Sequence, residues 1–102
     1  MNYDLPPDDI SLNCKKILNE APDMIAKYQE ELGKCITNLS RLKASIALDN
    51  RGEKQAILKA IVDSDKGVIA MSNEVTRLQV HYDLWKNAQS AARAFHKEQN
   101  LM

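Results

Sequence analysis

The 102-residue chain has few of the residues that interrupt regular secondary structure. It contains three glycines and three prolines, and two of the prolines are adjacent, at positions 6 and 7. A β-sandwich or β-barrel needs many turns between short strands, so this scarcity argues against both folds. Aromatic residues make up only 5% of the chain, and a mostly aliphatic core is therefore expected. The length fits one domain covering residues 1–102.

Membrane and export signals are also missing. No apolar run approaches the roughly 18 residues that a transmembrane helix needs. Residues 1–10 carry three Asp and no Lys or Arg, the reverse of a signal peptide. We therefore expect a cytoplasmic protein without membrane contact. Cys14 and Cys35 form no CxxC motif, which favours two free thiols over a disulfide or a zinc site.

The residue groups that catalysis requires are absent as well. The sequence has no phosphate-binding glycine loop, no GxSxG nucleophile motif and no HExxH zinc motif. Neither His81 nor His96 has a Cys, Asp or Glu at a spacing that completes a metal-ligand set. We predict no catalytic residues, no metal, no cofactor and no small-molecule substrate.

What the sequence does contain is a sustained heptad pattern. An irregular lead-in and three helices are expected, over residues 1–7, 8–20, 22–48 and 53–98. Asp8 or Asp9 would cap the short first helix, and Pro22 would open the second. Apolar residues of the second helix alternate spacings of three and four, at Ile25, Tyr28, Leu32, Cys35, Leu39, Leu42 and Ile46.

The third helix continues the same alternation. Its seam positions are Ile57, Ile61, Ser64, Val68, Met71, Val75, Leu78, Tyr82, Trp85, Gln89, Ala92 and His96. Residues 63–67 have poor helix propensity. The phase of the seam is unbroken across them, so we predict one continuous helix.

Two heptad-patterned helices joined by a tight turn at residues 49–52 form an all-α antiparallel hairpin. The third helix would overhang the shorter second one, and its end needs cover from the N-terminal helix or another subunit. A bare hairpin buries little surface, so we expect a homo-oligomeric bundle or ring. The predicted oligomer interface comprises Leu39, Leu42, Ile46, Val68, Val75, Leu78, Tyr82 and Trp85.

Charge is balanced overall but not locally. Residues 1–31 carry three basic and seven acidic residues, whereas residues 32–48 carry three basic and no acidic ones. Lys27, Lys34 and Arg41 recur every seven residues and form a line beside the seam, with Lys43 on its other flank. Steps of about 10 Å can follow a phosphate backbone. The alternative is a solvated face of a coiled coil.

A second basic set lies close to aromatic residues. Lys86, Arg93 and Lys97 flank Trp85 and Phe95, and such a combination can bind single strands by stacking and charge. Trp85 is a seam residue, however, so a core position is the alternative.

Several segments of the two long predicted helices form a recognisable pattern: Glu53-Lys54-Gln55, the stretch from Leu58 to Val68, then Leu78, Tyr82, Ala91, Arg93 and Ala94, and, before them, the basic segment from Ser40 to Ala44. Together these segments resemble UvsY-like recombination mediators of phages. The resemblance covers roughly residues 35–100. Where the family tends to have an aromatic pair, this chain has Ile46-Ala47-Leu48.

The resemblance implies a helical, non-enzymatic protein without a cofactor. Such proteins form ring-like oligomers and bind single-stranded DNA. They help load a RecA-type recombinase onto strands covered by a single-strand binding protein. DNA binding would fall on Arg41 and Lys43, with Lys34 and Arg51 as neighbours by proximity. The seven-residue spacing, and not the resemblance, adds Lys27 to the candidate DNA-binding residues. For a phage-encoded protein, the location would be the host-cell cytoplasm.

Two other functions fit the same fold, because fold alone does not determine function. One is a helical protein-binding module, such as a phage-encoded inhibitor or adaptor of a host protein, with no DNA affinity. The other is a secreted helical hairpin of the WXG type, although the turn at residues 49–52 contains no Trp.

Overall fold

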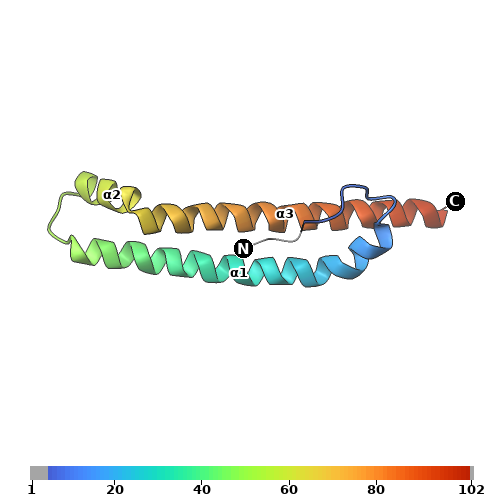
Figure 1. Ribbon diagram of the computed structural model, residues 1–102, viewed down its shortest axis with the longest axis horizontal. Coiled ribbons are helices and arrows are strands. Elements are labelled where there is room, and N and C mark those ends of the chain that lie inside the picture. Colours follow the sequence, from blue (N-terminus) through green and yellow to red (C-terminus); the bar gives the residue numbers. More distant parts are fainter. Residues whose placement is uncertain (1–4, 102) are drawn as a thin grey trace.

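The protein is a long antiparallel helical hairpin (Figure 1). The computed structural model describes residues 5–101, which contain α1 (Cys14–Asp49), α2 (Gln55–Ser64) and α3 (Lys66–Leu101). α1 and α3 lie side by side along a molecule of 68 × 22 × 17 Å, and α2 lies at the end where the chain turns. The predicted all-α hairpin is confirmed.

The N-terminal boundary differs from the prediction, because residues 14–49 form one helix with Pro22 inside it. Proline lacks a backbone N–H, so the carbonyl of Leu18 loses its usual partner at a cost of about 3 kcal/mol. Ile17 before the proline and Tyr28 after it are both fully buried. Because both side chains are buried on the side that faces α3, the parts of α1 before and after Pro22 both pack against α3. The first turns of α1 incline toward α3 (Figure 1).

Asp9 caps the turn that leads into α1. Its Oδ1 accepts hydrogen bonds from the N–H of Leu12 at 3.0 Å and the hydroxyl of Ser11 at 2.9 Å. Its carbonyl accepts the N–H of Asn13 at 3.1 Å. These bonds satisfy donors of the turn. The helix itself begins at Cys14, with Asn13 as its N-cap and no side-chain hydrogen bond at that cap, so Asp9 caps the preceding turn and not the start of a helix over residues 8–20. The first four residues of the predicted lead-in lie outside the described part of the chain.

The long helix predicted over residues 53–98 is interrupted at Asp65. This residue has extended backbone, with φ −64° and ψ 129°, and its Oδ1 accepts the N–H of Val68 at 3.0 Å. Aspartate favours such caps because its short side chain offers an acceptor to free backbone donors. α2 therefore ends at Ser64 and α3 begins at Lys66. The heptad phase continues across the break, but local capping decides the geometry.

The connection between α1 and α2 is the tight turn expected at residues 49–52. The side-chain amide of Asn50 donates to the carbonyl of Ile46 at 2.8 Å, at the end of α1. Gly52 has a φ of 106°, a left-handed conformation that favours glycine because it has no Cβ.

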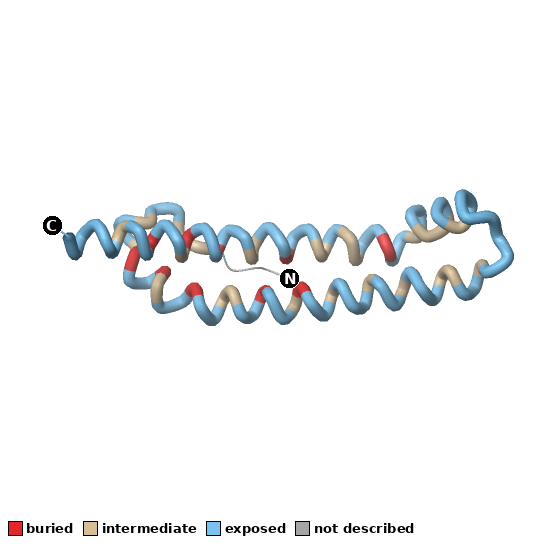
Figure 2. Tube along the Cα trace, turned by 180° about the vertical axis from the view of Figure 1, so that it is seen from behind, coloured by how far each residue is buried: buried red, intermediate tan, exposed pale blue. Residues whose placement is uncertain are grey.

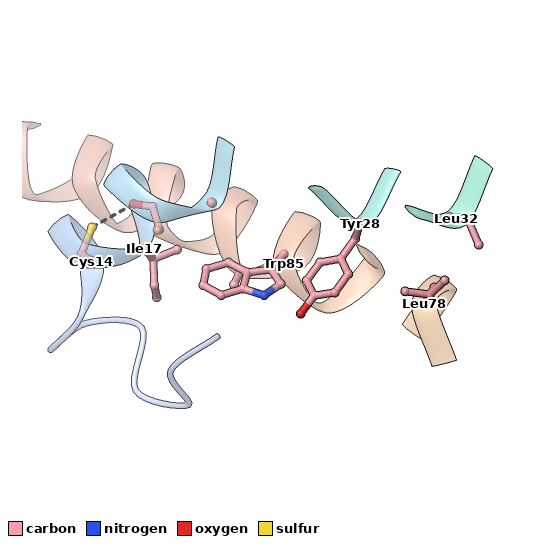
Figure 3. Close-up of a cluster of buried hydrophobic side chains, with 9 residues drawn as sticks. Cys14, Ile17, Tyr28, Leu32, Leu78 and Trp85 are labelled. Carbon is pink, nitrogen blue, oxygen red and sulfur yellow. Dashed lines mark hydrogen bonds between the residues drawn. The ribbon is translucent and has the colours of Figure 1, made fainter. Parts of the chain in front are cut away.

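The core lies in one half of the hairpin. We call residues 32–77 the turn half and the remaining residues the terminal half. Buried positions gather in the terminal half and at its boundary, while Val68 is buried near the start of α3 (Figure 2). The boundary and terminal-half cluster contains Cys14, Ile17, Ala21, Tyr28, Leu32, Leu78, Trp85, Ala88 and Ala92. Figure 3 shows Trp85 lying between Ile17 and Tyr28 in this cluster.

The overhang of the last helix is shorter than expected. α1 and α3 are each 36 residues long, because α1 continues through Pro22 and the break at Asp65 shortens the last helix. Cys14, the first residue of α1, lies against Ala92, so only the last turns of α3 extend beyond α1 (Figure 1). Cover for Trp85 comes from α1, and Ile10 of the lead-in also packs against the cluster. The terminal half therefore has a third layer over its hairpin.

Candidate nucleic-acid interface

The predicted basic line occupies one side of α1. Lys27, Lys34 and Arg41 are all exposed, and their seven-residue spacing places them about 10.5 Å apart along the helix. Lys43 is exposed on the other flank of the seam, and Arg51 is exposed in the turn after α1. All five side chains are accessible to a ligand.

The surroundings of the three cations in the line differ. The Nζ of Lys34 lies 3.1 Å from Oε1 of Glu30, whereas the Nζ of Lys27 lies 5.5 Å from the centroid of the Tyr28 ring. The lysine–glutamate pair is well exposed on both sides and so contributes little to stability. It does neutralise Lys34 in part.

Lys34 also lies among carboxylates from both helices. It lines a hollow of 300 Å³ with Glu31 of α1 and Glu74 of α3. Three nearby carboxylates, counting Glu30, oppose a phosphate at this step of the line. The surroundings of Lys34 are therefore less favourable to an anion than the seven-residue spacing alone predicts.

Arg41 lies in more favourable surroundings. A second hollow of 530 Å³ on α1 is lined by Gln29, Glu30, Gly33, Lys34, Thr37, Asn38 and Arg41. Toward the turn, this hollow offers the guanidinium of Arg41 with the amide of Asn38 and the hydroxyl of Thr37, which can all donate to phosphate oxygens. No carboxylate occurs between residues 32 and 48.

The fold adds basic residues that the sequence reasoning missed. α2 folds back at the turn end and carries Lys54 at its N-cap and Lys59 in its interior. Residues 32–77 carry eight basic and five acidic residues, whereas the rest of the chain carries six basic and nine acidic ones. The charge is therefore separated along the rod, with the turn half positive. The local charge imbalance between residues 1–31 and 32–48 already indicated part of this separation.

The aromatic residues of the second basic set differ in accessibility, and Phe95 borders an open hollow, together with Lys15, Lys16 and His96. Trp85 is buried between the helices, and Phe95 is half-buried. Lys86 places its Nζ 5.2 Å from the centroid of the half-buried Tyr82 ring. The core alternative for Trp85 is therefore the one observed, and Arg93 and Lys97 remain as exposed cations.

The residues predicted for an oligomer interface form the seam within one chain. Val68, Leu78 and Trp85 are buried between α1 and α3, so a second subunit cannot reach them while the hairpin is closed. The remaining ones are half-buried: Leu39, Leu42, Ile46, Val75 and Tyr82. The heptad pattern correctly identified residues that pack between helices. These residues pack α1 against α3 within one chain and are not shown to contact a second subunit.

The two cysteines are free thiols. The thiol of Cys14 is buried and donates to the carbonyl of Ala92 at 3.2 Å, as drawn in Figure 3.

Both histidines contact residues of their own helix. Nδ1 of His81 lies 2.7 Å from the carbonyl of Arg77, and Nε2 of His96 lies 3.1 Å from the amide nitrogen of Asn100.

Within residues 5–101, His, Cys, Asp and Glu form no group of three or more that could hold a metal ion. The helices of this part of the chain also include none with the length and apolar character needed to cross a bilayer. Comparison of the chain with models of protein families, with curated proteins and with solved structures finds no match.

Proposed function

We propose that this chain is a non-enzymatic accessory protein of phage-type DNA recombination, acting in the host-cell cytoplasm as a homo-oligomer. It binds single-stranded DNA and assists the loading of a RecA-type recombinase on strands covered by a single-strand binding protein. The resemblance to UvsY-like mediators names this role. The observation that carries it is the exposed basic group around Arg41, in the positive half of the rod.

The DNA-binding group consists of Arg41, Lys43 and Arg51, with Lys34 and Lys27 as the weaker steps toward the acidic half. Arg41 and Lys43 lie in a stretch of α1 that contains no carboxylate, so no neighbour in the sequence competes with a phosphate for them. Arg51 lies between Asp49 and Glu53 in the turn and is a weaker member of the group. Binding through three phosphate contacts predicts that log K falls with log salt with a slope of about −2.

The test is fluorescence anisotropy of a labelled single strand of about 30 nucleotides at low and moderate salt. We expect the double variant Arg41→Glu, Lys43→Glu to lose binding at low salt while its helicity by circular dichroism is unchanged. The matched control is Lys86→Glu, Arg93→Glu, which makes the same charge change at exposed residues of the terminal half. It should retain affinity to within about twofold to threefold.

Two outcomes would contradict the proposal. One is no binding of the wild-type protein even at low salt. The other is an equal loss of affinity in both double variants, which would point to net charge rather than to the group around Arg41.

A second candidate function is the helical protein-binding module without DNA affinity. Leu48 and Ile57 favour it, because both are large apolar residues exposed at the turn end, where burial against a partner would be favourable. A stoichiometric protein partner that is lost in Leu48→Asp, Ile57→Asp, together with no strand binding, would select this function.

A further inference from the structure

The two sides of the α1–α3 hairpin differ sharply in charge. Their register follows from contacts along the seam: Sγ of Cys35 lies 3.8 Å from the carbonyl oxygen of Met71, and the rings of Tyr28 and His81 are 5.8 Å apart. In an antiparallel heptad pair, a residue one position after a seam residue lies beside the seam. Such residues of both helices lie on the same side of the hairpin.

One of these sides, which we call the uncharged face, carries no ionisable side chain over about 16 Å of helix. It consists of Gln29, Gly33, Ile36 and Ser40 of α1 and Ile69, Ser72, Thr76 and Gln79 of α3. Every one of these residues is exposed or half-buried.

The opposite side of the same stretch is strongly charged. It carries Lys27, Glu31, Lys34 and Arg41 of α1 and Glu74, Arg77 and His81 of α3. Polar side chains without charge are also compatible with solvation, so the contrast alone does not define a contact surface. It does mean that a partner can cover this side without burying a charge.

Two isoleucines dominate the uncharged face. Ile36 and Ile69 are each 46% exposed, and the seam residues Leu39 and Met71 beneath them are only half-buried. In the terminal half, the lead-in with Ile10 supplies a third layer. Among residues 5–101, no such layer covers the turn half, where most of the tube in Figure 2 is exposed or intermediate.

The total surface of the chain indicates how large the missing cover is. A compact monomer of 11.5 kDa exposes about 5,800 Å². This chain exposes 7362 Å², an excess of about 1,600 Å² over that reference. A standard interface between two proteins removes about 800 Å² from each partner. The excess belongs to the whole elongated rod of 68 × 22 × 17 Å, so the chain has surface available for a contact of this size, while the residues of the face indicate the position of the contact.

We propose that the uncharged face of the turn half packs against the same face of a second copy of the chain. An isologous contact brings identical residues together, and a surface without charges meets its own copy without repulsion. The contact leaves Lys27, Lys34 and Arg41 on the opposite side open to solvent, whereas Lys43 lies on the flank of the uncharged face, just beyond Ser40. Self-association does not require DNA.

The proposal is tested by sedimentation velocity over a range of protein concentrations. We expect a wild-type mass above that of one chain. The double variant Ile36→Glu, Ile69→Glu should weaken self-association by about tenfold or more, because it places charges in the contact. The matched control is Val80→Glu, since Val80 is 48% exposed on α3 but lies outside the face. It should associate like the wild type.

A second variant distinguishes loss of self-association from unfolding. Ser40→Lys, Thr76→Lys removes no apolar residue and adds like charges to the face of each copy, so it should stay helical and dissociate to single chains. A wild-type protein of one-chain mass at about 100 μM, well above a micromolar dissociation constant, would overturn the proposal. So would an undiminished mass in both face variants, or an equal loss of mass in Val80→Glu.

Discussion

At the scale of single residues, Asp9 has the clearest electrostatic role. Hydrogen bonds to its carboxylate from the N–H of Leu12 and then the hydroxyl of Ser11 lower its pKa below the ordinary value of 3.8. A carboxyl whose pKa is lower in the folded state stabilises that state when ionised. The contribution is present above pH 3.8 and is lost as the pH falls through the folded-state pKa.

Asp9→Asn tests this role, because asparagine keeps an oxygen acceptor for the cap but does not titrate. We expect the melting temperature of the wild type to fall relative to that of Asp9→Asn as the pH drops below about 4. Thermal unfolding by circular dichroism at a series of pH values measures the difference. The wild type and Asp9→Asn have all other carboxyl groups in common. If their plots of melting temperature against pH stay parallel below about pH 4, Asp9 does not contribute.

Single residues also explain why the basic line is uneven. Its seven-residue spacing makes Lys34 and Arg41 equivalent on a helical wheel. Part of the difference is local, because Glu30 and Glu31 lie four and three residues before Lys34, whereas Thr37 and Asn38 hold those positions before Arg41. The packed hairpin adds Glu74, which α3 places in the same hollow as Lys34. Spacing within one helix holds no information about a residue 40 positions away.

At the scale of elements, Asp65 separates α2 from α3. Its Oδ1 accepts the N–H of Val68, and Asp65→Ala removes this cap. We expect the free energy of unfolding to fall by about 1 kcal/mol, as for other capping residues. Urea unfolding followed by circular dichroism measures this free energy.

The control is Asp63→Ala, two residues away on an exposed face of α2, which should change stability by less than about 0.5 kcal/mol. Equal losses in the two variants would assign the effect to charge.

The elements show how far the sequence predicts this fold. Seam spacing predicted which residues of α1 and α3 face each other, because burial of an apolar stripe dominates helix packing. It did not predict the ends of the helices. Pro22 lies inside α1 because burial on both sides outweighs its local cost, and Asp65 breaks a helix whose seam phase is continuous. Each boundary depends on a balance of about 1–3 kcal/mol between local and tertiary terms.

At the scale of the whole molecule, stability is unevenly distributed along the rod. Trp85, Tyr28 and Ile17 are the largest fully buried side chains, and all three belong to the terminal half. Of the buried positions in the turn half, Leu32 lies at its boundary with the terminal half, and Val68 lies near the start of α3. Local opening requires less free energy where fewer apolar contacts are lost. The turn half should therefore open more often than the terminal half.

Hydrogen exchange measured by mass spectrometry tests this expectation and separates folding from assembly. In the Ile36→Glu, Ile69→Glu variant, we expect amides of α2 to exchange fastest and amides near Trp85 slowest. In the wild type at high concentration, self-association should slow exchange in α1 and α3 of the turn half, since those segments carry the uncharged face. The terminal half should exchange alike in both proteins, because its cover comes from its own chain. Faster exchange near Trp85 than in α2 would contradict the assignment of the core to the terminal half.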